Sequence, residues 1–110
     1  MVVTTREQAI EQVKSFLRDC KSIGLYIKKT IMFGSAARDE MNEWSDIDIM
    51  LVSDNFTLNT FDNIKQYSRI NINYPDIETH PFPTDYFIES DPFIEEIKRT
   101  GIEIHQEEIQ

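Results

Sequence analysis

The sequence is poor in cysteine, glycine, proline and basic residues, and it has no long hydrophobic run. Its single cysteine, Cys20, excludes an internal disulfide and a zinc site built from several thiolates. No apolar run approaches the ~18 residues that span a bilayer, and the first residues lack the basic and apolar regions of a signal peptide. We therefore expect a cytoplasmic protein in which Cys20 is a packed core thiol.

Charge narrows the range of ligands. The chain has 110 residues, with 11 Lys and Arg against 20 Asp and Glu, which gives a net charge of −9. A field of this sign repels a nucleic-acid backbone, so a long DNA or RNA ligand is disfavoured. A small anionic ligand that carries a divalent metal ion remains compatible, because the ion supplies positive charge. The length and the 40% apolar content predict one folded domain over residues 1–110.

Hydrophobic periodicity predicts alternating helices and strands. Apolar residues recur at three- and four-residue steps over residues 6–23, and Thr4 or Thr5 fits the N-cap of this helix. Helices are also predicted at 35–39, from Asn59 or Thr60 to about 68 with Phe61 and Ile64 inward, and at 92–100 with Asp91 as N-cap and Phe93 inward. Strands are predicted at 29–33, 46–52 and 76–82, the last stopped by Pro81 and Pro83, with an edge strand at 102–104. This order indicates an α/β or α+β domain with a small sheet of three or four strands flanked by helices.

Two aspartates interrupt the otherwise apolar strand at 46–52. Asp46 and Asp48 are two residues apart, so their carboxylates share one face of the strand, about 7 Å apart along the backbone. Such a pair suffers mutual repulsion and desolvation, and bound metal ions relieve both. The alternative is structural: Asp46 caps a turn and Asp48 faces solvent.

A second pattern precedes these aspartates. Gly34 and Ser35 end the strand at 29–33, and Arg38 follows one helical turn later. Glycine permits close approach of a ligand to the backbone, while the Ser35 hydroxyl and the Arg38 guanidinium suit phosphate oxygens. The simpler alternative is a turn followed by a helix cap.

The spacing of the two patterns is distinctive, with ten residues between Ser35 and Asp46. The segment from Phe33 to Leu51 resembles the signature of the DNA polymerase β-like nucleotidyltransferase superfamily, and more narrowly the minimal nucleotidyltransferases, or MNT proteins. The resemblance implies a mixed sheet, a Gly34–Ser35 turn that holds a nucleoside triphosphate, and two magnesium ions bound by Asp46 and Asp48. Asp39 departs from the pattern, since many relatives have glycine after the arginine.

The same resemblance implies a third carboxylate on a later strand. Asp76, Glu78 and His80 alternate and so share one face of the strand predicted at 76–82. Glu78 is our preferred residue because it lies in the middle of this strand, and Asp76 is the alternative. His80 either contacts substrate or is a strand-end histidine before Pro81.

The function implied is transfer of AMP, or another nucleoside monophosphate, from ATP or another NTP to an acceptor hydroxyl with release of pyrophosphate. Relatives of this size often act as the antitoxin of a pair with a helical HEPN-type toxin, and a tyrosine of that partner is then the acceptor. Two other functions remain open. One is a non-catalytic module that inhibits a partner by covering it, and the other is a transferase that modifies an antibiotic hydroxyl.

Overall fold

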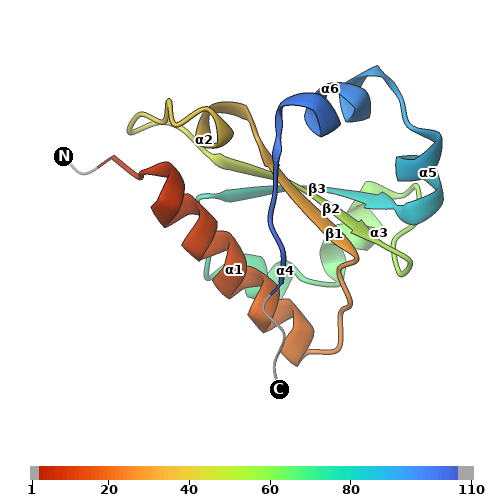
Figure 1. Ribbon diagram of the computed structural model, residues 1–110. Helices are drawn as coiled ribbons and strands as arrows, with labels where there is room; N and C mark the ends of the chain where they lie inside the picture. Colours follow the sequence, from red (N-terminus) through yellow and green to blue (C-terminus); the bar gives the residue numbers. More distant parts are fainter. Residues whose placement is uncertain (1–2, 107–110) are drawn as a thin grey trace.

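A mixed sheet with helices on both faces forms the centre of the computed structural model, which describes residues 3–106 (Figure 1). The elements in chain order are α1 (Arg6–Ser22), β1 (Lys29–Phe33), α2 (Gly34–Ala37), β2 (Ile47–Ser53), α3 (Thr60–Lys65), α4 (Ser68–Asn71), β3 (Ile77–Pro83), α5 (Thr84–Glu89), α6 (Pro92–Thr100) and β4 (Ile102–Glu103). None of the helices within residues 3–106 has the length and apolar character needed to traverse a membrane.

The four strands are arranged in the order β3-β2-β1-β4. β1 is antiparallel to both β2 and β4, whereas β2 is parallel to β3. In this register Asp48 on β2 has Phe33 of β1 on one side and Glu78 of β3 on the other. The predicted α+β class and the mixed sheet are thus confirmed, and the register brings two of the candidate acidic residues side by side.

One face of the sheet is covered by α1. The apolar stripe predicted for this helix is buried from Ala9 to Cys20, and it packs on the inward residues of β2, which are Ile47, Ile49 and Leu51. Tyr67 closes the same core, where its hydroxyl lies 2.7 Å from the Thr79 hydroxyl on β3. Alternation along β2 therefore directs every second residue into the hydrophobic layer under α1.

The opposite face is covered mainly by α6, which lies across the sheet from α1 (Figure 1). Here Met50 and Val52 of β2 pack with Ile31 of β1 against Ile94 and Ile97 of α6. Asp48 belongs to this face because it alternates with Met50 and Val52. The carboxylate therefore lies where the apolar layer under α6 ends.

Several predicted caps are present. The Thr5 hydroxyl accepts from the backbone N–H of Gln8, and the Gln8 side chain accepts in return from the N–H of Thr5. Asn59 caps α3, and Asp91 caps α6 by accepting from the N–H of Ile94. These local signals define the helix starts well because each depends only on neighbours in sequence.

The segment after β2 differs from its prediction. The single helix expected from 59 to 68 is divided into α3 and α4, and Phe61 is 67% exposed instead of inward. Asn63 takes the buried position, where its side chain both accepts from the Thr57 N–H at 2.8 Å and donates to the Thr57 carbonyl at 2.7 Å. A doubly hydrogen-bonded amide can be buried at little cost, which hydrophobic periodicity does not predict.

The third strand also differs. β3 continues through Pro81 to Pro83 instead of stopping at Phe82, and α5 follows it directly. Proline is tolerated there because β3 is an edge strand, so a missing N–H on its outer side costs no ladder hydrogen bond. Phe93, predicted to point inward from α6, is 46% exposed.

Candidate active site

Asp48 is the centre of the candidate site. It is the second residue of β2, and its neighbours along the strand, Ile47 and Ile49, are fully buried on the α1 side. These apolar neighbours hold the strand in place and leave the Asp48 side chain on the other face, where it is 26% exposed. A carboxylate in this position is fixed by the core and still accessible to a ligand.

Gly34 lies directly against this carboxylate. It begins α2 with a φ of +70°, a conformation that glycine adopts without strain. A Cβ added at this position would be 3.0 Å from Oδ2 of Asp48. The absence of a side chain therefore provides the room that the Asp48 carboxylate occupies.

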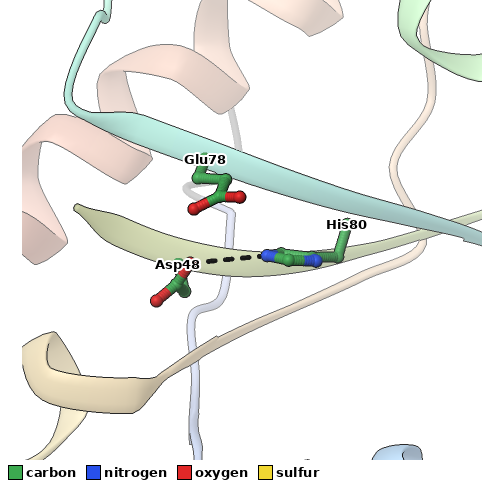
Figure 2. A group of neighbouring side chains, drawn as sticks. All are labelled: Asp48, Glu78 and His80. Atoms are coloured by element: carbon green, nitrogen blue, oxygen red, sulfur yellow. Dashed lines mark hydrogen bonds and ion pairs between the residues drawn. The ribbon is translucent and has the colours of Figure 1, made fainter.

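Glu78 and His80, which both lie on β3, form a cluster with Asp48 of β2 (Figure 2). Glu78 is the register partner of Asp48, and His80 follows two residues later on the same face. One potential ligand atom from each of the three side chains lies within 4.8 Å of the other two. The Nε2 atom of His80 is 3.4 Å from Oδ1 of Asp48, as the dashed line shows.

Aromatic rings hold the imidazole of His80. Its ring centroid lies 5.1 Å from that of Phe33 and 6.2 Å from that of Phe93 on α6. Phe33 and Phe93 also contact each other edge to face, at 5.8 Å. The half-exposed Phe93 therefore serves as a wall of the site.

The electrostatics of the cluster are unfavourable without a cation. The pKa of Glu78 is raised, first by partial desolvation and then by its hydrogen bonding and charge repulsion with Asp48. The charge of Asp46 raises this pKa further, whereas His80 opposes the shift. Two neighbouring carboxylates thus resist ionising together, and a divalent cation would remove this penalty.

Asp46 and Asp76 are placed differently from these residues. Asp46 is exposed and precedes the first residue of β2, and Asp76 is exposed and precedes the first residue of β3. Among residues 3–106, neither contributes to the cluster of potential ligand atoms. The charge of Asp46 still contributes to the raised pKa of Glu78, and Asp46 precedes Asp48 by two residues in the chain. Of the two candidates for the third carboxylate, the structure places Glu78 beside Asp48.

The two candidate phosphate ligands also differ in position. Ser35 is half-buried in α2, directly after Gly34. Arg38 is the C-cap of α2 and pairs on the surface with Glu40, with Nε 3.0 Å from Oε2. In this arrangement Ser35 adjoins the site, whereas the guanidinium of Arg38 is bound to a neighbouring loop residue.

The donor set suits a divalent cation. Carboxylate oxygens are the ligands that Mg²⁺ prefers, and Asp48 and Glu78 offer them from adjacent strands. Glycine at position 34 keeps the space beside Asp48 free of side-chain atoms. The cluster can therefore hold a cation, and the Gly34–Ser35 turn lies beside it because Phe33, the residue before Gly34, pairs with Asp48.

His80 is the residue that the sequence left unresolved. Its alternation with Glu78 predicts a shared face but does not indicate which side chains lie opposite. The pairing of β2 with β3 supplies that information, because it sets Glu78 opposite Asp48 and brings Nε2 of His80 within 3.4 Å of the Asp48 carboxylate.

Two comparisons with known proteins found a match. A family model described as a nucleotidyltransferase domain matches residues 13–108. A crystal structure of a candidate nucleotidyltransferase from Sulfolobus solfataricus is similar, with a TM-score of 0.66 and 19% sequence identity over 89% of this chain and 80% of that chain. This likeness shows the fold alone. No curated protein matches the sequence significantly.

Proposed function

Because this chain belongs to the nucleotidyltransferase domain family, we propose that it transfers AMP from ATP, or another nucleoside monophosphate from its triphosphate, to a hydroxyl of a partner protein. The observation that carries the proposal is the placement of Asp48 beside Glu78 on adjacent parallel strands, with Gly34 against the Asp48 carboxylate. An acidic pair next to a glycine–serine turn suits phosphoryl chemistry, in which the protein mainly positions charge.

In the proposed reaction the acceptor oxygen forms a bond to the α-phosphorus of the triphosphate. The bond from this phosphorus to the bridging oxygen breaks, and pyrophosphate leaves. The acceptor proton passes to a carboxylate, and Glu78, which lies beside Asp48 on the adjacent strand, is placed to receive it. Gly34 and Ser35 contact the phosphates through their backbone N–H groups and the Ser35 hydroxyl.

Asp48 and Glu78, with Asp46 at their border, would hold the divalent cations. Magnesium ions bound there supply positive charge that neutralises the triphosphate and the developing pyrophosphate. The chain itself provides little such charge, since Arg38 is paired with Glu40.

The partner in this proposal is a HEPN-type toxin in the cytoplasm, with the chain as its antitoxin. The net charge of −9 supports a partner with a basic surface, as expected of a protein that binds RNA. Inhibition then follows from covalent addition of AMP to the toxin.

The test combines the chain with the protein encoded by the adjacent gene, ATP and Mg²⁺, and measures the intact mass of that protein. We expect one or more added AMP units with the native chain and none with Asp48→Asn. Asp62→Asn is the matched control, because it makes the same substitution at an exposed aspartate of α3.

If the native chain and Asp48→Asn inhibit the partner equally and neither adds mass to it, the proposal is wrong. The chain is then a non-catalytic module that inhibits its partner by covering it. A thermal shift of the chain alone with ATP and Mg²⁺ gives an independent check, because nucleotide that binds only the native state stabilises it.

A further inference from the structure

His80 adds a third potential metal ligand to the cluster, besides the carboxylates of Asp48 and Glu78. Its Nε2 atom points toward Asp48 and lies 3.4 Å from Oδ1, and it is part of the group whose potential ligand atoms are all within 4.8 Å (Figure 2). His80 follows Glu78 by two residues on β3, so both side chains reach the same face. An imidazole nitrogen and two carboxylates thus face one small space.

The ring is held in this orientation by its surroundings. Phe33 and Phe93 contact it from β1 and α6, with centroid distances of 5.1 and 6.2 Å. The His80 side chain is 29% exposed, which is close to the 26% of Asp48. The phenylalanine rings cannot form strong hydrogen bonds to the nitrogens of His80. Their contacts therefore orient the imidazole without occupying its nitrogen atoms.

We propose that His80 binds the cation through Nε2 and makes the site selective for a divalent transition-metal ion, with Mn²⁺ preferred over Mg²⁺. The inference rests on the proposed function, since it concerns the same cation site. Mg²⁺ favours a shell of oxygen ligands, whereas imidazole is a good ligand for first-row transition metals. Mn²⁺ accepts carboxylates as readily as Mg²⁺ and gains from the additional nitrogen.

A different role for His80 would be to orient Asp48 by a hydrogen bond. The two roles have different consequences for metal selectivity. An orienting residue affects the binding of Mg²⁺ and Mn²⁺ to the same extent, because both ions use the Asp48 carboxylate. A nitrogen ligand affects the transition-metal ion selectively.

The decisive variant is His80→Phe, which keeps an aromatic ring against Phe33 and Phe93 and removes both nitrogens. Isothermal titration with Mn²⁺ alone and with Mg²⁺ alone gives the two affinities. We expect the Mn²⁺ affinity to fall about tenfold or more, the scale typical of lost metal-site interactions, while the Mg²⁺ affinity stays within about twofold. The visible absorption of bound Co²⁺ should also change, because its ligand set changes.

His105→Phe is the matched control, since it alters the other histidine of the chain, whose side chain is 83% exposed beside Glu103. This variant should bind both ions like the native chain. His80→Gln provides a second measurement if the phenylalanine variant does not fold; it offers an oxygen in place of nitrogen and should lose the preference for Mn²⁺.

The outcomes separate this inference from the proposed function. An unchanged ratio of Mn²⁺ to Mg²⁺ affinity in both His80 variants overturns the ligand role, whether the two affinities stay the same or fall together. If Asp48→Asn loses metal binding in the same experiments, the proposed function still stands even though the ligand role of His80 is overturned. If the native chain binds neither ion, with or without ATP, the proposed function fails as well.

Discussion

Replacement of Gly34 by alanine tests how closely α2 and the Asp48 carboxylate depend on each other. Two effects are expected. The φ of +70° is strained for a residue with a Cβ, which costs roughly 1–2 kcal/mol of stability. In addition, the new Cβ would lie 3.0 Å from Oδ2 of Asp48, which is shorter than an ordinary van der Waals contact. The carboxylate must therefore shift by a few tenths of an ångström.

Gly24→Ala separates the two effects. Gly24 has a φ of +86°, and a Cβ at this position would have no atom within 4 Å. Both variants should therefore lose about the same free energy of unfolding, roughly 1–2 kcal/mol, in urea denaturation followed by circular dichroism. Only Gly34→Ala displaces a side chain of the candidate site.

The functional consequence should follow the displacement. A misplacement of about 1 Å costs on the order of 100-fold in rate, so a shift of a few tenths of an ångström should cost roughly tenfold. We expect that loss for Gly34→Ala in AMP transfer and in Mg²⁺-dependent ATP binding, and none for Gly24→Ala. Equal ATP affinity and equal transfer rates in the two variants would refute the argument that glycine is required at position 34 to make room for Asp48.

Two further predictions concern the core. Gly101→Ala should destabilise the fold by about 1–3 kcal/mol in urea denaturation, because its Cβ would lie 2.4 Å from Cγ2 of Ile31 and 2.7 Å from the Ile97 carbonyl; a loss no greater than that of Gly24→Ala would contradict this. Burial raises the pKa of Cys20 from 9.0 to about 12, so iodoacetamide at pH 8 should label the thiol only after unfolding. The same shift means that the contribution of Cys20 to stability is complete below about pH 9 and is lost as the pH rises toward 12, because only the unfolded chain ionises its thiol in that range. Rapid labelling of the native chain at pH 8 would contradict the raised pKa.

The parts of the fold that depend on neighbours in sequence were predictable. The stripe of α1, its Thr5 cap and the Asp91 cap of α6 each involve residues three or four positions apart, and all are present. The segment 29–33 matches β1, because its β-branched residues and the following Gly34 mark both the strand and its end.

The partners of distant strands were not predictable in the same way. Asp76 and Glu78 both fit the alternation of the third strand, and the sequence offered only a preference for the residue nearer its middle. The parallel ladder decides their places, since it sets Glu78 opposite Asp48 and leaves Asp76 before the first residue of β3. Register between strands about 30 residues apart follows from packing on two faces, which no local pattern contains.

The conformation of Asp39 shows a related limit. This residue stands where many members of the resembled family have glycine, and its φ of +58° is the left-handed conformation that glycine favours. Aspartate is among the residues that tolerate this conformation, and here its Oδ1 accepts a hydrogen bond from the backbone N–H of Arg6 at 3.0 Å. The sequence indicated an unusual residue in the loop, but its partner at the start of α1 lies 33 positions away.

The role of His80 is ambiguous from the sequence for the same physical reason. A histidine before Pro81 on an edge strand most simply ends that strand in solvent, and its own neighbours in sequence do not favour another role. Three long-range contacts change this interpretation: Phe33 and Phe93 hold the ring, and Asp48 faces Nε2. Each contact comes from a different element, β1, α6 and β2, so the chemistry available to His80 is a property of the assembled sheet and not of the strand that carries it.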